Sequence, residues 1–410
     1  MWEQGGAGVG GNDEILVINA GSSSVKFAVF VRTAGERRPR RTGGGVVERI
    51  GTPGMTVRAD GAPTPATKSA GTSFADAARL VITWMKSRKD AGKILGIGHR
   101  VVHGGLREAK HALVDEHLLM ELRRARPLDL AHLPREIELM ETFAQEFKGV
   151  PQVACFDSAF HAAMPTVAKM YGIPRKYYAA GVRRLGFHGL SYAYLMEELE
   201  RVAGREAAMG KVILAHLGSG ASMAAVRGGT PMDTTMGFTP TAGLVMGTRP
   251  GDMDAGLLLY LMRAERMNAE QADAFINEQC GLLGVAETTY DMRELSRKRA
   301  TGDVRAAEAM ALFSYSARKW IAALAAVMGG VETLVFAGGI GEHATDVRSE
   351  ICAGLDFLGI RLDEKRNAAS EAPISREGSP VAVRVIKTDE EVMIAQITEG
   401  LAAQNLAPAE

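Results

Sequence analysis

The feature that most constrains the fold is a unit of strand, small-residue turn and strand that occurs twice, about half a chain apart. In the first copy, the apolar run 15–18 leads through a turn of Asn, Gly and Ser into 25–29, where apolar residues alternate. In the second copy, the apolar run 212–217 leads through the turn 218–222 into a strand that starts at Met223. Short apolar runs predict buried strands, and alternation predicts a strand paired to the first. The repeated unit therefore predicts a duplicated α/β fold.

The turns of both copies are built from residues that let an anion approach the backbone. Small side chains leave N–H groups accessible, and Lys26, just after the first turn, adds a mobile positive charge suited to phosphate. A third glycine-rich turn, 338–343, follows the predicted strand 333–337. Ligands of α/β folds usually bind at such strand ends. None of the turns matches Gly-x4-Gly-Lys-[Ser/Thr], which excludes a Walker-type phosphate loop.

The rest of the chain alternates between predicted helices and strands, as an α/β fold requires. Further strands are predicted at 94–102, 153–156 and 381–387, with a β-rich excursion over 43–70. Helices are predicted over 74–89, over 115–147 with a break near Pro127 and Pro134, over 252–328, after Asp157, and at the C-terminus.

The composition is that of a globular protein with more than one core, since 46% of the 410 residues are hydrophobic and 23% are charged. The 48 basic and 48 acidic residues cancel, which argues against a general nucleic-acid or membrane-surface binder. The basic cluster Arg37–Arg41 contains a proline, so we expect a solvated loop there. Cys155, Cys280 and Cys352 are far apart and favour a reducing compartment.

The N-terminal segment and the apolar stretches bear on localisation. No unbroken apolar stretch is long enough to cross a bilayer. Residues 1–12 are glycine-rich and lack a hydrophobic signal core, so we expect a disordered leader on a cytoplasmic protein. We accordingly expect no nucleic acid and no membrane among its partners.

One motif keeps a different class of enzyme open. Gly339–Ala344 matches Gly-x-Gly-x-x-[Gly/Ala], and Asp363 follows at about the distance of a ribose-binding acid. A single match of this kind is weak, and it leaves a dinucleotide-binding oxidoreductase as an alternative.

Taken together, the motifs resemble the acetate kinase family. The matching segments occur in the family's order from residue 13 to beyond 390, and they are 17–26, 99–105, 156–161, 186–189, 216–222, 246–252, 339–342 and 389–391. The resemblance implies the duplicated actin-like ATPase fold of the acetate and sugar kinase, heat-shock chaperone and actin superfamily, with the nucleotide in the cleft between two similar domains. It implies an N-terminal domain of 13–158 completed by 391–410, and a nucleotide-binding C-terminal domain of 159–390.

The activity implied by the resemblance is reversible, in-line transfer of the γ-phosphoryl group of ATP to acetate, giving acetyl phosphate and ADP. The family also implies Mg²⁺, or Mn²⁺, and a homodimer. A carboxylate with a pKa of about 4 to 5 is ionised at neutral pH, so its attack needs no general base. The protein must instead supply position and positive charge against the phosphoryl group.

The resemblance assigns roles to the charged residues of these motifs. Arg100 is expected to hold the substrate carboxylate, while Arg249 and His188 stabilise the transferring phosphoryl oxygens. Arginine suits both tasks because its planar fork binds two oxygens at once. The substrate pocket implied by the resemblance is lined by Val102, Ala131, His132, Phe187 and Pro240.

The same resemblance implies the metal and nucleotide ligands. Asp157 is expected to orient the metal and its water rather than to transfer a proton, and Asn19 and Glu390 are the further metal candidates. Glu390 alternatively only caps the C-terminal helix. The nucleotide is expected to contact Lys26, His216, Leu217, Gly218, Ser219, Gly220, Asp291, Met292, Arg293, Gly339, Ile340, Gly341, Glu342 and His343.

The chain departs from the family pattern at two positions. Ser219 stands where Asn is usual, which removes an amide donor. Ala131 stands where the family has a leucine that lines the methyl pocket, so the acyl-chain preference is open. The alternatives are a propionate or mixed short-chain fatty acid kinase, and a non-catalytic nucleotide-binding protein of the actin-like superfamily. The residues that argue against the non-catalytic alternative are Arg100, Asp157, His188, Arg249 and Glu390.

Overall fold

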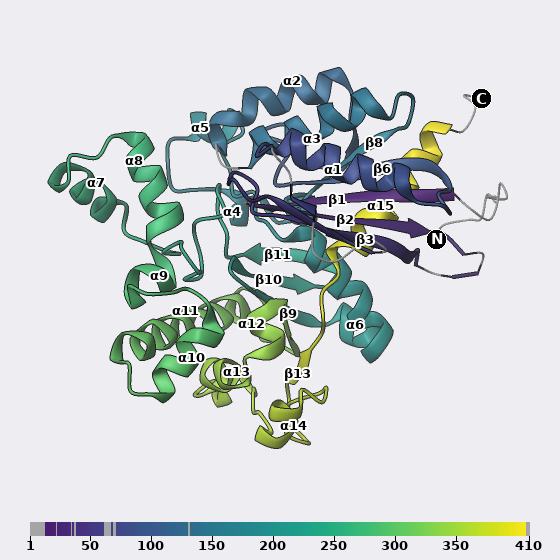
Figure 1. The fold of residues 1–410 in the computed structure, drawn as a ribbon. Coiled ribbons are helices and arrows are strands. Elements are labelled where there is room, and N and C mark those ends of the chain that lie inside the picture. Colours follow the sequence, from purple (N-terminus) through teal and green to yellow (C-terminus); the bar gives the residue numbers. More distant parts are fainter. Residues whose placement is uncertain are drawn as a thin grey trace. The chain divides into compact units, whose positions relative to one another are not determined.

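The computed structural model describes residues 13–21, 23–33, 35–36, 38–60, 67–68, 71–129 and 132–406 (Figure 1). Its contacts divide the chain into two compact units. Unit 1 contains the residues up to Ala159 together with those from Asp389, and unit 2 is Phe160–Thr388. The expected leader 1–12 and Ala131 lie outside the described residues.

Unit 1 is built on a mixed sheet whose strands follow the order β5-β4-β3-β2-β1-β6-β8-β7. The strands are β1 (Asp13–Ala20), β2 (Ser24–Val31), β3 (Arg40–Glu48), β4 (Thr56–Ala59), β5 (Thr67–Lys68), β6 (Lys93–Val101), β7 (Ala112–Leu113) and β8 (Gln152–Phe156). β1 and β2 form the predicted antiparallel hairpin, in which Ala20 pairs with Val25 next to the turn. β6 and β8 continue the sheet in parallel with β1.

Helices cover both faces of this sheet in Figure 1, with α1 (Phe74–Ser87) and α3 (Leu133–Glu146) on one face and α15 (Glu390–Leu406) on the other. α1 starts at a capping box, in which the Ser73 hydroxyl accepts from Asp76 N and Asp76 accepts from Ser73 N. Its apolar side packs on the strands, and Phe27 meets Trp84 edge to face at 4.9 Å. α2 (Glu116–Ala125) and a 3₁₀ turn (Arg126–Leu128) precede α3, so the break predicted near the two prolines is confirmed.

Glycines in β6 allow α15 to lie close to the sheet. Successive side chains of a strand point to opposite faces, so Ile97 enters the core under α1 and α3 while Gly96 and Gly98 face α15. A Cβ atom at Gly98 would lie 2.1 Å from Thr398 Oγ1 and 2.6 Å from Ile394 Cγ2. The absence of a side chain at Gly98 therefore sets the distance between helix and sheet.

Unit 2 repeats the arrangement on a smaller sheet with the order β11-β10-β9-β12-β13. Its strands are β9 (Lys211–Leu217), β10 (Ala221–Arg227), β11 (Thr230–Thr234), β12 (Thr333–Ala337) and β13 (Ala382–Val385). As in β3-β2-β1-β6-β8, the first pairings are antiparallel and the last two are parallel. The duplicated α/β fold predicted from the repeated hairpin is confirmed.

The helices of unit 2 also lie on both faces of their sheet, with α6 (Gly189–Met209) on one and α11 (Val304–Met328) on the other (Figure 1). The predicted helical region 252–328 is a series of separate helices. These are α7 (Ala255–Ala264), α8 (Ala269–Ala274), a π-helical turn (Phe275–Gln279), α9 (Gly281–Ala286), α10 (Met292–Ala300) and α11. The remaining helices are α4 (Thr166–Lys169), α5 (Arg175–Ala179), α12 (Gly338–His343), α13 (Thr345–Cys352) and α14 (Glu364–Ala369).

Two expectations about local structure need correction. The third glycine-rich stretch is not a turn, because β12 passes directly into α12 at Gly338, whose φ of +76° makes the bend. The helix expected after Asp157 is only a 3₁₀ turn, Ala159–Ala163, followed by the four-residue α4. Within the described part of the chain, no helix combines the length and apolar character needed to span a membrane.

The sheet of unit 1 is completed by a helix that follows unit 2 in the sequence. α6 directly precedes β9 in sequence and packs on it within unit 2. α15 follows β13 of unit 2 but packs on β6, β1 and β8 of unit 1. The chain therefore passes from one unit to the other twice.

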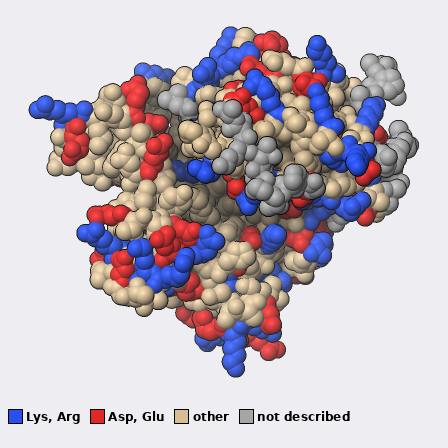
Figure 2. Space-filling view, viewed as in Figure 1, with Lys and Arg blue, Asp and Glu red and all other residues tan. Residues whose placement is uncertain are grey.

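Charges on the visible surface are mixed. Figure 2 shows acidic and basic side chains interspersed over the part of unit 2 that contains α10 and α13. Arg299 on α10 pairs with Asp346 and Glu350 of α13, and Arg293 pairs with Asp291. These are local ion pairs rather than a field of one sign.

We predict that Gly98→Ala destabilises the protein by about 1–3 kcal/mol, because the new methyl group overpacks the contact between β6 and α15. The measurement is denaturant unfolding. Gly400→Ala is the matched control, because it adds the same methyl group at an exposed position of α15 where a Cβ meets nothing within 4 Å. The control should be neutral or more stable by about 0.5–1 kcal/mol. Unchanged stability of Gly98→Ala would contradict the close packing described above.

Candidate active site

The first group of predicted site residues gathers at the carboxyl ends of neighbouring strands in unit 1. β1 ends at Ala20, β6 at Val101 and β8 at Phe156, so their next side chains meet at one edge of the sheet. Arg100 donates from Nη2 and Nε to Asp157 Oδ2, at 2.6 and 3.1 Å, and from Nη1 to the Ala20 carbonyl at 3.0 Å. The guanidinium is thus held in a fixed plane across the ends of these strands.

The electrostatics of this group are those of buried charges that depend on one another. Burial tends to lower the pKa of Arg100, but Asp157 and Glu390 outweigh it and raise the pKa above its usual value. Burial also raises the pKa of Asp157, which Arg100 counteracts and Glu390 reinforces. Asn19 Nδ2 donates to Glu390 Oε2 at 3.1 Å, which adds an amide to the same group.

The oxygen atoms here suit a hard divalent cation such as Mg²⁺. The buried Asp157 Oδ1 has no hydrogen-bond partner among the described residues, and Glu390 and Asn19 supply further oxygens. No group of three or more His, Cys, Asp or Glu side chains with metal-ligand geometry occurs among the described residues. Mg²⁺ usually takes one or two carboxylates and keeps its other positions for water and substrate phosphates. The donor set therefore fits Mg²⁺ and does not fit a cage made by protein alone.

The C-terminal helix is capped by the neighbour of Glu390. Asp389 Oδ1 accepts from Val392 N at 3.0 Å, which is the hydrogen bond of an N-cap. The side chain of Glu390 instead meets Asn19. The alternative that Glu390 serves only as the cap is therefore wrong.

A buried glutamate that sequence reasoning missed supports the carboxyl end of β6. Both carboxyl oxygens of Glu136 lie 3.2 Å from Val102 N, and the residue is 2% exposed. Burial raises the pKa of Glu136 to about 8, although Arg100 acts in the opposite direction. Helical periodicity offers the signal that was overlooked, because Glu136 lies one turn after His132.

His132 lies at the start of α3, where Asp129 holds it. Its Nδ1 is 3.0 Å from both carboxyl oxygens of Asp129, and its backbone N–H donates to Asp129 Oδ1 at 2.8 Å. Burial tends to raise the pKa of Asp129, but His132 outweighs it and lowers the pKa. Val102 is buried next to the end of β6. Lys26, another predicted site residue, is exposed on β2, where it pairs in register with Asn19.

The second group gathers around Gly220 in unit 2. His188, the N-cap residue of α6, has the left-handed backbone angles φ 58° and ψ 23°, which are uncommon for a residue other than glycine. A Cβ at Gly220 would lie 3.2 Å from Arg249 Nη2 and 3.4 Å from His188 Nε2. The missing side chain therefore lets both groups lie against the turn between β9 and β10.

A layer of hydroxyl groups holds the histidines of this group. The rings of His188 and His216 stack at 4.3 Å, with 23° between their planes. His188 Nδ1 is 2.8 Å from Ser222 Oγ, and His216 Nδ1 is 2.8 Å from Ser191 Oγ. Ser222 and Ser191 were not among the predicted site residues, although Ser222 belongs to the turn motif itself.

The predicted pocket residues of unit 2 lie next to this group in sequence. Phe187 is buried, and its carbonyl oxygen lies 3.0 Å from His161 Nε2. The Pro240 carbonyl accepts from Arg249 Nη1 at 2.6 Å. The contact with Pro240 fixes the direction of the Arg249 guanidinium.

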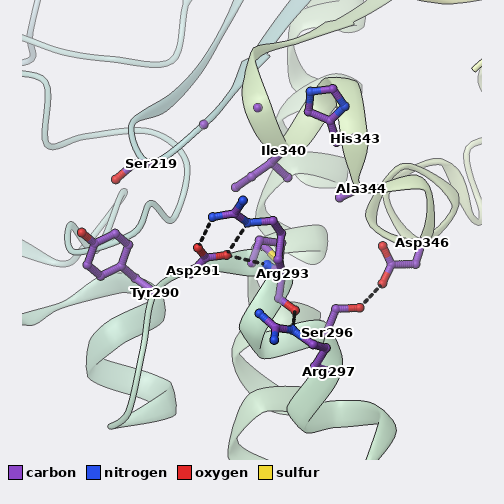
Figure 3. A pocket seen from close by; sticks show the side chains of 13 residues that line it. Ser219, Tyr290, Asp291, Arg293, Ser296, Arg297, Ile340, His343, Ala344 and Asp346 are labelled. Carbon is purple, nitrogen blue, oxygen red and sulfur yellow. Dashed lines mark hydrogen bonds and ion pairs between the residues drawn. The ribbon is translucent and has the colours of Figure 1, made fainter. Parts of the chain in front are cut away.

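A pocket of about 720 Å³ lies in unit 2 between the β9–β10 turn, α10 and α12. In Figure 3, Arg293 and Asp291 face each other in the middle of the view, with Ile340 and His343 above them and Tyr290 to one side. Arg293 donates to Asp291 from Nη2 at 2.6 Å, and this lowers the pKa of Asp291 to about 2. The predicted nucleotide residues that line the pocket are Gly218, Ser219, Asp291, Met292, Arg293, Gly339, Ile340 and His343.

Other predicted nucleotide residues do not line this pocket. Glu342 turns inward, where its Oε1 accepts from Gly338 N at 3.0 Å and Thr388 N at 3.2 Å. The others outside the lining are Lys26, His216, Leu217, Gly220 and Gly341. The lining residues that were missed are Tyr290, Ser296, Arg297, Ala344 and Asp346. Arg297 lies one turn after Arg293 on α10, so the helix period was an available signal.

The geometry around Gly339–Ala344 differs from that of a dinucleotide fingerprint. The glycines of that fingerprint form a turn that opens a longer helix. Here Gly339 and Gly341 lie inside the six-residue α12. The described strands also form mixed sheets in both units, whereas a dinucleotide-binding fold is built on a mostly parallel sheet.

Comparison with known proteins identifies the family. The acetokinase family model matches residues 14–396. The acetate kinase of Methylocella silvestris is 38% identical over 405 residues, covering 96% of this chain and 99% of that protein. Among solved structures, Porphyromonas gingivalis acetate kinase has a TM-score of 0.85 at 34% identity, covering 95% of this chain and 99% of its own. A propionate kinase from Francisella tularensis has a TM-score of 0.88 at 36% identity, covering 95% and 100%. This chain therefore belongs to the acetokinase family.

Proposed function

We propose that this enzyme transfers the γ-phosphoryl group of ATP to acetate, reversibly, giving acetyl phosphate and ADP by direct in-line displacement. The observation that carries the proposal is the similarity, over nearly the whole chain, to proteins named acetate kinase. Arg100, His188 and Arg249, on which the resemblance relies, support it through their fixed positions. We also assign the enzyme to the cytoplasm, and its two domains to 13–158 with 391–410 and to 159–390.

Arg100 binds the acetate carboxylate in this proposal. The nucleophile is already ionised at neutral pH, so it has to be held rather than deprotonated. Asp157 and the Ala20 carbonyl hold the guanidinium in one plane, which reduces the freedom lost when a carboxylate binds. Val102 and His132 lie around this end of β6 and α3, and Glu136 fixes the backbone of Val102.

Arg249 and His188 stabilise the phosphoryl group during transfer. Charge spreads over its equatorial oxygens, so preorganised donors aimed at them lower the barrier. Arg249 is oriented by the Pro240 carbonyl, and His188 by Ser222. Gly220 leaves the space in which such oxygens would meet both donors.

ATP binds in the pocket between α10, α12 and the β9–β10 turn. Ile340 and Met292 provide apolar surface for a base, and Arg293 supplies charge. Ser219 takes the place of an asparagine in the family turn and keeps a short polar side chain there. ADP occupies the same pocket in the reverse reaction.

Asp157, Glu390 and Asn19 are the residues that would hold Mg²⁺, or Mn²⁺. When bound, the cation neutralises phosphate charge and polarises the group being transferred. Asp157 pairs with Arg100, which counteracts the effect of burial on its pKa, and it orients the oxygens around it. It does not exchange a proton with acetate, since acetate brings none.

A propionate or mixed short-chain fatty acid kinase is the second candidate. The similarity to a protein named propionate kinase, at a TM-score of 0.88, favours it. Ala131 in place of the family leucine also favours this candidate, because the smaller side chain leaves more room for a longer acyl chain.

We further propose a homodimer. α7 has the sequence Ala-Gly-Leu-Leu-Leu-Tyr-Leu-Met-Arg-Ala, yet none of its residues is buried. Leu257, Leu259 and Tyr260 are 44%, 51% and 63% exposed. A run of exposed apolar side chains on one helix is typical of a surface that a second chain covers.

We expect acetohydroxamate to form when the protein is incubated with ATP, Mg²⁺, acetate and hydroxylamine, and we expect Arg100→Ala and Arg249→Ala to lose it. Each loss should be about two to three decades in turnover, as for other preorganised donors. Arg201→Ala removes an exposed arginine paired with Glu198 and is the matched control. Melting curves verify folding, since removal of Arg100 leaves Asp157 without its counter-charge. Near-wild-type turnover of either variant would overturn its assigned role.

We predict that Asp157→Asn raises the Mg²⁺ concentration required for half-maximal activity by roughly 10- to 100-fold, because a charged ligand becomes neutral. The measurement is a Mg²⁺ titration at several pH values. The pH profile of the wild type should contain no limb that the substitution removes. A normal Mg²⁺ requirement together with a missing limb would instead support proton transfer by Asp157.

We predict that Ala131→Leu lowers the ratio of kcat/KM for propionate over acetate. A methylene group in a hydrophobic pocket contributes only about 1–3 kcal/mol, so discrimination should sharpen without becoming absolute. The assay compares both substrates in the wild type and the variant. An unchanged ratio would show that the chain-length preference is set by other residues.

A further inference from the structure

Three side chains in unit 2 form a continuous hydrogen-bonded row that ends at His188. Tyr192 OH and Ser222 Oγ form a short hydrogen bond, and Ser222 Oγ lies 2.8 Å from His188 Nδ1. Tyr192 and Ser222 are fully buried, at 0% exposure. Hydrogen bonds between dry groups keep one direction, because water does not compete for them.

Acidity sets the direction of donation along this row. The Ser222 hydroxyl has a single proton, so it donates to one neighbour and accepts from the other. A phenol, with a pKa of about 10, is a stronger acid than an aliphatic alcohol, and the imidazole lone pair is the strongest base of the three. Donation therefore runs from Tyr192 to Ser222 and from Ser222 to His188 Nδ1.

This direction determines which nitrogen of His188 carries the proton. When Nδ1 accepts from Ser222, the proton of a neutral ring resides on Nε2. A Cβ built at Gly220 would lie 3.4 Å from that Nε2 and 3.2 Å from Arg249 Nη2. The N–H donor is thus directed to the same place as the guanidinium.

We propose that Tyr192 and Ser222 are positioning residues that keep His188 neutral with its proton on Nε2, so that it donates a hydrogen bond to the phosphoryl group during transfer. The inference rests on the proposed function for the identity of the acceptor, but not for the tautomer. No bond to hydrogen breaks in this role. His188 holds its proton throughout, and Arg249 supplies the charge.

The tautomer is measured directly on enzyme containing ¹⁵N-labelled histidine. Long-range ¹H–¹⁵N spectra distinguish the two neutral tautomers and the cation, and the spectrum of His188→Asn identifies the His188 signals by their loss. We expect the Nε2-protonated form at neutral pH in the wild type. In Ser222→Ala we expect the signals to shift toward a mixture of forms. An Nδ1-protonated or doubly protonated His188 in the wild type would overturn the proposal, whether or not the protein forms acetyl phosphate.

Steady-state kinetics supply the second measurement. Tyr192→Phe keeps the ring and removes only the hydroxyl, and we expect kcat to fall about tenfold with little change in either KM. Tyr194→Phe removes a hydroxyl from the same helix outside the row, and its kcat should equal that of the wild type.

A double-mutant comparison separates positioning from general support of the fold. If Tyr192 acts through His188, Tyr192→Phe should cost nothing further in a His188→Ala background. An equal tenfold loss in that background would overturn the proposal, because the hydroxyl would then act by a route that bypasses His188.

Discussion

The Arg100–Asp157 ion pair is the interaction on which the arrangement of side chains at the strand ends of unit 1 depends. Taking two charges out of water costs several kcal/mol each, and the attraction between them offsets this only when the geometry is close and further hydrogen bonds are made. Asp157 Oδ2 and the Ala20 carbonyl provide that geometry, and Glu390 adds negative charge nearby. An arginine surrounded by more carboxylates than it can pair with is poorly suited to stability alone. It is well suited to a site that must bind one more anion beside a cation.

The duplicated topology gives the two sheets different tasks. In each sheet a central strand, β1 or β9, has an antiparallel neighbour on one side and a parallel neighbour on the other. In unit 1 the strand ends carry the ion pair and, beside it, the Asn19–Glu390 hydrogen bond. In unit 2 the corresponding turn carries Gly220, beside which His188 and Arg249 converge. The same strand arrangement therefore presents an arginine–carboxylate pair in one copy, and an arginine beside a histidine in the other.

Patterns local in sequence predicted the fold well, whereas contacts between distant segments remained hidden. Apolar runs joined by small-residue turns located both hairpins, and the motifs located Arg100 and Arg249. Glu136 was missed because its role depends on a hydrogen bond from Val102 N, which lies outside its own helix. The row from Tyr192 to His188 was missed for the same reason, since Ser222 lies on β10 and forms hydrogen bonds with two residues of another element, α6 and its N-cap. Glycines at 339 and 341 predicted a turn but lie in α12, where the short helix leaves β12 without a linker.

The return of α15 to the sheet of unit 1 has a consequence for how the protein is made. A ribosome releases the strands of unit 1 long before it releases α15, which begins at Glu390. Until then, the glycines of β6 face an empty groove, and the nascent sheet exposes the apolar surface that Ile394 will cover. Domains usually fold as their segments emerge, but the sheet of unit 1 is covered on this face only after α15 has been made. Chains truncated before α15 therefore lack the helix that covers one face of this sheet. Their exposed apolar surface favours aggregation.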